Sequence, residues 1–372
     1  MKVRIPYINL IRQIKEEKKE VLKALEKVLS KGQFVLGKEV DKFEKKICKF
    51  LGVKNCVALN SGTDALVLGL HLLGVRKNHE IITPPNSFVA STAAIVHLGA
   101  IPIFADVKDD QNIDPYEIEK KISANTKAIM PVHLSGKPCE MDKISYISKK
   151  YNIPIIEDAA QSIGTKYRNK FVGTFGKVGC FSAHPLKNLN AIGDSGYLVT
   201  NDNKLAKKAK LLRNHGIEKR NKILHFGYVS RMDNLQATVL NLRFKKLKKV
   251  IQKRRLNAKL YNSYFKNIKN IRLIKENTKE FHTYHTYVIL AEKRNKLKKY
   301  LESKGILTAI HYPKLIFDQK AYKKRFKTIN SNKFPMSRDL NQNILTLPIN
   351  QFISSTQIKK IYNEIKNFYK KK

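Results

Sequence analysis

The chain has 372 residues, of which 42% are hydrophobic, and a formal net charge of +43. This length allows two domains or one large one, and the lack of a signal-peptide pattern or of an apolar stretch of about 18 residues predicts a soluble, cytoplasmic protein with no membrane partner. Such a charge is typical of nucleic-acid-binding proteins, but the lysines are spread along the whole chain, which favours a compositional bias and no nucleic-acid partner.

The N-terminal part predicts two helices and then an alternation of strands and helices. Apolar residues recur at helical spacing over residues 14–29 and 38–51. Short apolar strands are expected at 56–59, 80–83, 101–105, 128–132 and 153–157, with helices at 65–73, 87–98 and 141–151. Because such an alternation is typical of a mostly parallel sheet covered on both faces, we predict a doubly wound α/β domain.

The character of the sequence changes after Ser230. Residues 231–266 read as one long helix, and the later residues mix helices with strands such as 287–290. We therefore predict a large α/β domain over residues 1–244 and a smaller C-terminal α+β domain over residues 245–372.

The first candidate functional element is the loop at residues 60–63, Asn-Ser-Gly-Thr, between a predicted strand and a predicted helix. Gly62 would let the backbone approach a ligand closely, and free N–H groups at the start of the helix would bind an anion, with the Thr63 hydroxyl adding a hydrogen bond. A plain helix cap by Ser61 or Thr63 is the competing interpretation.

The second element is the buried strand at residues 153–157, which runs into Glu157 and Asp158. Ligands of open α/β sheets bind at the carboxyl ends of the strands, so Asp158 lies where function is expected. The competing interpretation is a helix N-cap. A carboxylate next to a buried strand needs a partner, and a protonated ring nitrogen would be one.

The third element is Lys187, in the segment 179–188 that precedes the glycine-rich turn at 193–196. A single lysine in a loop is usually only solvated. Here it accompanies a candidate phosphate site and a candidate carboxylate for a pyridine nitrogen. A lysine that forms a Schiff base completes the set of groups that pyridoxal phosphate (PLP) requires.

Five motifs in this order resemble the DegT/StrS family of sugar aminotransferases: SGTDAL (61–66), EDAAQSIG (157–164), FSAHPLKNL (181–189), GDSGYLVTND (193–202) and SRMDNLQA (230–237). The similarity extends from the first helix to His311-Tyr312-Pro313 and Leu347-Pro348, which is nearly the whole chain. It implies a fold type I PLP-dependent transferase, with a mostly parallel, seven-stranded type of sheet.

The resemblance also implies roles for residues that match the family motifs. Lys187 would form the Schiff base and later act as the base that moves a proton, and Asp158 would pair with the pyridine nitrogen. Gln161 would lie against the ring hydroxyl and Phe88 on the ring, and the phosphate would be held by Gly62, Thr63 and Ser182.

On the substrate side, the resemblance implies that Arg231 holds the carboxylate of the amino donor and reaches in from the other subunit of a homodimer. We group His184, His311 and Tyr312 with the substrate-binding residues. His184 could be a proton shuttle or a structural hydrogen-bonding residue beside the cofactor.

Two positions depart from the family pattern. Family members often carry Asn as a phosphate ligand immediately before the Ser-Arg pair, where this chain has Val229. A further proline is common after the His-Tyr-Pro motif, where this chain has Lys314-Leu315. The first departure affects the expected phosphate site, and the second affects substrate identity.

No metal site or disulfide is expected. His282 and His285 have metal-like spacing, but residues 281–290 read as a strand, in which residues three apart face opposite sides. The four cysteines have no CxxC or metal-ligand spacing: Cys48, Cys56, Cys139 and Cys180.

The sequence thus predicts a PLP-dependent aminotransferase that moves an amino group from glutamate to a keto-sugar, for surface polysaccharide or glycan biosynthesis. The sugar is expected to be a nucleotide-linked 3- or 4-keto-deoxyhexose. One alternative is the sugar dehydratase branch of the family, in which histidine replaces the Schiff-base lysine, so Lys187 argues against it. A basic nucleic-acid-binding or regulatory protein is an alternative of another class that only the charge supports.

Overall fold

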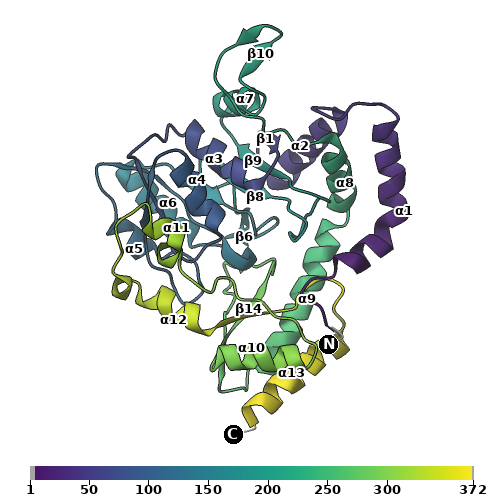
Figure 1. Cartoon of the computed structure of the whole chain (residues 1–372), viewed down its shortest axis with the longest axis vertical. Coiled ribbons are helices and arrows are strands. Elements are labelled where there is room, and N and C mark those ends of the chain that lie inside the picture. The colour runs from purple at the N-terminus through teal and green to yellow at the C-terminus, as the bar shows by residue number, and fades with distance from the viewer. Residues whose placement is uncertain (1–4, 371–372) are drawn as a thin grey trace.

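The computed structural model describes residues 5–370. A large sheet covered by helices makes up most of the chain up to about residue 245, and a smaller sheet with its own helices, around β14, α10 and α13, lies at the bottom of Figure 1.

Seven strands form the large sheet. A four-stranded and a three-stranded part are joined by parallel bridges from Ile129 to Ile155 and from Val132 to Asp158. The combined order is β1 (Asn55–Leu59), β9 (Gly196–Thr200), β8 (Val178–Ser182), β5 (Ile156–Asp158), β4 (Thr126–Ile129), β2 (Glu80–Thr83) and β3 (Ile101–Phe104). Only β9 runs against the others. The predicted mostly parallel, seven-stranded type of sheet is therefore confirmed.

The strands bury both faces, because successive side chains point to opposite sides of the sheet. Val57 and Leu59 of β1 belong to one hydrophobic cluster, while Cys56 and Ala58 belong to another. The first cluster is covered by α3 (Gly62–Leu72), α4 (Val89–His97) and α7 (Asn203–Leu212). The opposite face is covered by α2 (Lys38–Leu51), α8 (Asn234–Phe244), α5 (Pro115–Glu119) and α6 (Met141–Tyr151).

The predicted helices at 38–51 and 141–151 are confirmed, but the single helix at 231–266 is wrong. Helix α8 ends at Phe244, and α9 begins at Leu247 and ends at Phe265. The N–H groups of Lys245 and Lys246 bond to carbonyls three residues back, at Leu242 and Arg243, which tightens the last turn of α8. No proline or glycine marks this break, so the helical periodicity appears continuous in the sequence.

The smaller sheet is antiparallel, in the order β12 (Ile271–Leu273), β14 (Tyr287–Ala291) and β15 (Ile344–Leu347). Its hydrophobic cluster includes residues of α9, α10 (Arg294–Ser303) and α13 (Ser355–Lys370), together with Ile5 from the N-terminal end. The strand expected at 287–290 is confirmed as part of β14. The domain boundary at 244/245 stays a prediction.

The remaining elements are short, apart from α1 (Leu10–Leu29), which packs on α8 through a buried ion pair between Glu17 and Arg243. The strand predicted over 281–290 is interrupted, because β13 ends at Phe281 and β14 begins at Tyr287. The other elements are β6 (Lys166–Tyr167), β7 (Lys170–Phe171), β10 (Ile217–Lys219), β11 (Lys222–Ile223), β13 (Glu280–Phe281), α11 (Lys320–Lys323), α12 (Pro335–Asn343) and turns at Leu134–Gly136, Ile316–Asp318 and Ser331–Lys333.

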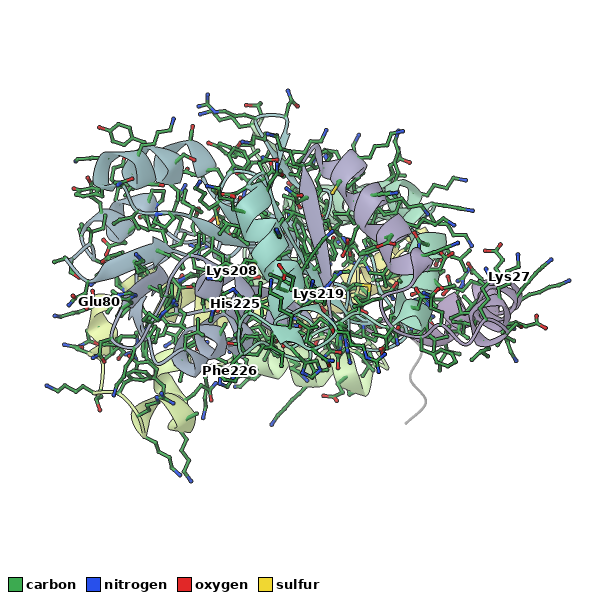
Figure 2. All side chains as sticks on the ribbon, turned by 90° about the horizontal axis from the view of Figure 1, so that it is seen from above. Lys27, Glu80, Lys208, Lys219, His225 and Phe226 are labelled. Atoms are coloured by element: carbon green, nitrogen blue, oxygen red, sulfur yellow. The ribbon has the colours of Figure 1, made fainter. Side chains whose placement is uncertain are left out.

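The hairpin of β10 and β11 projects from the top of the molecule in Figure 1. Figure 2 looks down on the molecule from this side and labels Lys219, His225 and Phe226; nitrogen-tipped side chains project at every edge of that view. Among the described residues, no helix is long and apolar enough to cross a membrane.

Candidate active site

The register of the sheet gathers the candidate residues at one edge. Strands β1, β8 and β5 share one direction, so their carboxyl ends meet at the same side of the sheet. There Leu59 and Ser182 both pair with Gly196, and Asp158 pairs with Cys180. The loops that leave these strands, with Gly62, Ser182 and Asp158, therefore lie together.

The start of α3 lies at this edge of the sheet and is capped by a serine. The Ser61 hydroxyl caps the helix by accepting the N–H of Asp64 at 3.0 Å. The N–H groups of Gly62 and Thr63 belong to the first turn and have no partner within the helix. A Cβ on Gly62 would lie 2.6 Å from the Cβ of Ser182, so only glycine allows this approach. The cap by Ser61 is therefore confirmed, and the anion site at this loop stays a prediction.

Asp158 is a buried carboxylate at the end of β5, with 5% of its surface exposed. Its Oδ2 accepts the Ser91 hydroxyl at 2.7 Å and its Oδ1 accepts the N–H of Ala160 at 3.1 Å. Burial raises the pKa of the Asp158 carboxyl, and these two hydrogen bonds and Lys187 oppose the shift. The next residues form a turn rather than a helix, so the N-cap interpretation is wrong.

Lys187 lies in the loop between β8 and β9, which is held by its own hydrogen bonds. The Lys187 N–H donates to the His184 carbonyl at 2.9 Å, and the Asn190 amide donates to the Pro185 carbonyl at 2.6 Å. Burial lowers the pKa of the Lys187 amine to about 8, while the carboxylate of Asp158 opposes this shift. A larger fraction of this amine is therefore neutral near pH 7 than for an exposed lysine.

This lowered pKa predicts how the protein without cofactor captures PLP. Only the neutral amine is nucleophilic, and it predominates above its pKa. The capture rate should rise about tenfold per pH unit below pH 8 and level off above it, whereas an ordinary lysine would continue to about pH 10.4. Stopped-flow absorbance measures the rate. In Asp158→Asn the inflection of the rate–pH curve should move to lower pH, because the negative charge that raises the pKa of Lys187 is gone. A wild-type capture rate that still rises at about pH 10 would contradict the assignment of Lys187.

Gln161 connects two sides of the site. Its Oε1 accepts the N–H of Ser135 at 2.7 Å, which fixes the amide so that Nε2 donates to the Tyr312 hydroxyl at 3.2 Å. The rings of Tyr312 and Phe88 are 6.0 Å apart. Tyr312 thus joins Gln161 and Phe88 across a space next to Asp158, whose charge acts on the Tyr312 hydroxyl.

Three histidines lie near Lys187 and are held neutral. Burial lowers the pKa of His311 to about 4 and also lowers the pKa of His184 and, strongly, of His285; the charge of Lys187 adds to each shift. Nδ1 of His311 lies 3.0 Å from the Thr346 hydroxyl. Neutral imidazoles can each accept a hydrogen bond from a substrate.

Arg231 and Val229 follow the projecting hairpin along the chain. The Arg231 guanidinium donates to Asn214 at 2.9 Å, and no hydrogen bond or ion pair within residues 5–370 joins it to Lys187 or Asp158. Val229 is 61% exposed. Ser230 between them is buried and donates to Asp64 of α3 at 2.6 Å, so its hydroxyl is already engaged.

Two residues of the site were missed from the sequence. Ser91 holds Asp158 from α4, and the only hint was its position one turn after Phe88. His285 was considered only as a metal ligand and dismissed because a strand was expected. It lies in the loop between β13 and β14, and its buried Nδ1 has no hydrogen-bond partner in the described chain.

Comparison with known proteins identifies the group to which this site belongs. A profile of the DegT/DnrJ/EryC1/StrS aminotransferase family matches residues 15–366. The chain belongs to this family. The resemblance seen in the sequence motifs is thereby confirmed.

Individual relatives agree with this assignment along the whole chain. The chain is 37% identical over 365 residues to the dTDP-3-amino-3,6-dideoxy-alpha-D-galactopyranose transaminase of Aneurinibacillus thermoaerophilus, covering 98% of this chain and 99% of that relative. It is 34% identical over 363 residues to the UDP-N-acetyl-3-dehydro-alpha-D-glucosamine 3-aminotransferase of Acidithiobacillus ferrooxidans, covering 97% of each. The solved structure of DesV from S. venezuelae has a TM-score of 0.96 at 31% identity and 99% coverage of both chains.

As a member of this family, the protein is a PLP-dependent sugar aminotransferase. Its residues fit the cofactor. Asp158 is a buried carboxylate with no ion-pair partner among the described side chains, and Lys187 is a buried amine with a lowered pKa. The start of α3 adds unpaired N–H groups for a phosphate.

Proposed function

We propose that this enzyme moves the amino group of glutamate to a nucleotide-linked keto-hexose, in the biosynthesis of a surface polysaccharide or another glycan. The proposal rests on one observation: the buried amine of Lys187, the buried carboxylate of Asp158 and the N-terminus of α3 lie at the same edge of the sheet. The sugar dehydratase alternative is disfavoured, because position 187 holds lysine.

In this proposal, Lys187 would hold PLP covalently through its amine, and Asp158 would pair with the protonated ring nitrogen. The bound cofactor would supply a ring that accepts electrons when a proton leaves the amino-bearing carbon. Once its amine is free, Lys187 is the base that carries this proton. Gln161 donates to the ring hydroxyl, Phe88 packs on the ring, and the phosphate is held by Gly62, Thr63 and Ser182.

The substrate side of the proposal consists of His184, His311 and Tyr312, which surround Lys187. The neutral imidazoles and the phenol offer hydrogen bonds to sugar hydroxyls. Tyr312 is fixed through Gln161, so a sugar bound to it lies at a defined distance from the amine of Lys187.

We further propose that the active unit is a homodimer, in which Arg231 serves the partner's site. The segment before it carries exposed apolar side chains, among them Ile223, Phe226 and Val229, and such patches are typical of interfaces. This segment continues the projecting hairpin (Figure 1). Val229 offers a phosphate only its backbone N–H.

If Arg231 binds the glutamate carboxylate, Arg231→Lys should slow the glutamate half-reaction about 10- to 100-fold, because lysine cannot form the bidentate pair. The half-reaction with the amino-sugar should change far less. Single-turnover absorbance measures each half. Arg272→Lys, at an exposed arginine paired with Asp339, is the matched control and should match the wild type. Equal losses in both halves, or an active monomer in sedimentation, would contradict the arrangement.

The proposed substrate class can be tested directly. Purified holoenzyme with glutamate is offered a panel of dTDP- and UDP-linked 3-keto and 4-keto hexoses, together with the same sugars without a nucleotide, and 2-oxoglutarate is followed. Turnover confined to nucleotide-linked sugars supports the proposal. If the free keto-sugars were turned over with equal kcat/KM, the nucleotide would not be part of the recognised substrate.

A further inference from the structure

A cavity of about 920 Å³ lies between the large sheet region and helix α9. None of its lining residues is among those assigned to the active site. One wall is made of Phe50 from α2, Phe171 from β7 and Gly164, and the opposite wall is a face of α9. The volume lies within the range of small-molecule sites in proteins, roughly 300–1,000 Å³.

One side of this cavity is aromatic. The rings of Phe50 and Phe171 are 4.9 Å apart, and Phe281 and Tyr284 line the cavity from the segment around β13. Phe50, Phe171 and Phe281 are only partly buried. The Lys166 amine lies over the Phe171 ring at 4.6 Å and the Arg255 guanidinium over the Phe281 ring at 4.1 Å, so a ligand can reach the ring surface outside these two contacts. Flat aromatic groups of a ligand pack well against such walls.

The other side is cationic. Lys248, Gln252, Arg255, Leu256 and Lys259 recur every three or four residues and form one face of α9. Together with Lys166, they give the cavity four cations against one carboxylate, Glu276, which is already paired with Arg255 at 2.7 Å. The three lysines have no ion pair among the described residues.

Aromatic surface beside unpaired lysines is complementary to a ligand that combines a flat ring with a multivalent anion. We propose that this cavity, which we call the α9 cavity, binds a nucleoside diphosphate at a site separate from the active site. The base packs against Phe50, Phe171 and Phe281, and the phosphates meet Lys248 and Lys259.

The α9 cavity and the active site lie on either side of one loop. Tyr284 lines the cavity, and the next residue is His285, whose pKa responds to the charge of Lys187. The carbonyls of both residues accept hydrogen bonds from Arg254 of α9, at 3.2 and 3.0 Å. The loop between β13 and β14 therefore separates the two sites. The proposal does not depend on which sugar the enzyme aminates.

Equilibrium dialysis of the holoenzyme with UDP and with dTDP tests the proposal. Leu256 is 62% exposed, so Leu256→Asp places a carboxylate in the α9 cavity with little risk to folding. The dissociation constant of the nucleotide bound in the α9 cavity should rise at least about tenfold in this variant, while any nucleotide bound elsewhere is unaffected. Lys259→Ala should raise the same dissociation constant. Pyrophosphate alone and uridine alone should each bind more weakly than UDP.

Matched controls separate this site from a general effect of charge. Leu22→Asp adds the same charge at an exposed leucine of α1, and Lys253→Ala removes a lysine of α9 outside the cavity lining; both should bind like the wild type. The melting temperature checks folding. Unchanged binding in Leu256→Asp, equal losses in the controls, or pyrophosphate binding as tightly as UDP would each overturn the proposal.

Discussion

Replacing Lys187 by alanine should lower transamination by at least about 10⁴-fold, the upper range for loss of a positioned general base, because the same residue is also the proposed covalent anchor of the cofactor. The visible absorbance of covalently held PLP should disappear. Part of the Lys187 residue is exposed although its amine is buried, and its loop is held by hydrogen bonds of Asn190 and His184, so the fold should survive the truncation.

The control for this prediction is Lys187→Arg, which keeps the positive charge but not a nucleophilic amine, since the guanidinium is not deprotonated in proteins. It should be as inactive as the alanine variant while retaining PLP noncovalently. Rates of both half-reactions and the absorbance spectrum distinguish the cases. Turnover of Lys187→Arg or Lys187→Ala near the wild-type rate would remove Lys187 from the mechanism.

The sequence predicted Asp158 at the carboxyl end of a strand, where ligands of open α/β sheets bind, and the structure confirms that position. The strand order of the structure brings Gly62 and Ser182 to the same edge. The strands were also recognisable as short continuous apolar runs, since the strands of the large sheet are buried on both faces. These features depend on local pattern and on general topology, and both are available without coordinates.

Other features depend on contacts between distant residues. Ser91 reaches Asp158 across 67 positions, and nothing in the local sequence predicts that pairing. The break between α8 and α9 has no glycine or proline, so the periodicity conceals it. His285 was predicted in a strand, because the alternating pattern of residues 281–290 also fits a buried loop. In the structure it lies in the loop between β13 and β14, near enough to Lys187 for that charge to lower its pKa.

The buried pair of Lys187 and Asp158 shows why neither residue alone would suffice. Burial lowers the pKa of the amine and raises the pKa of the carboxyl, so each group is pushed toward its neutral form, while each opposes the shift of the other. Ser91 and the Ala160 N–H add further support for the carboxylate. A ring nitrogen that carries a proton would supply the remaining compensation for its negative charge.

Replacing Asp158 by asparagine should therefore lower kcat about 10²- to 5 × 10³-fold, the equivalent of the roughly 3–5 kcal/mol lost when one member of a buried charge pair is removed. Asparagine is nearly isosteric and can still accept the Ser91 hydroxyl, so the fold should persist. PLP should remain bound through Lys187, since the covalent anchor is intact.

Two further variants decide whether the effect comes from charge at this position. Asp114→Asn, the same substitution at the partly exposed N-cap of α5, should be silent because asparagine caps equally well. Ser91→Ala should cost about tenfold or less, since it removes one hydrogen bond from the carboxylate but not its charge. Steady-state rates and a pH titration of bound-cofactor absorbance measure all three. If Asp158→Asn were no slower than Ser91→Ala, the carboxylate would serve only to hold the turn at Ala160, and the ring nitrogen would need another partner.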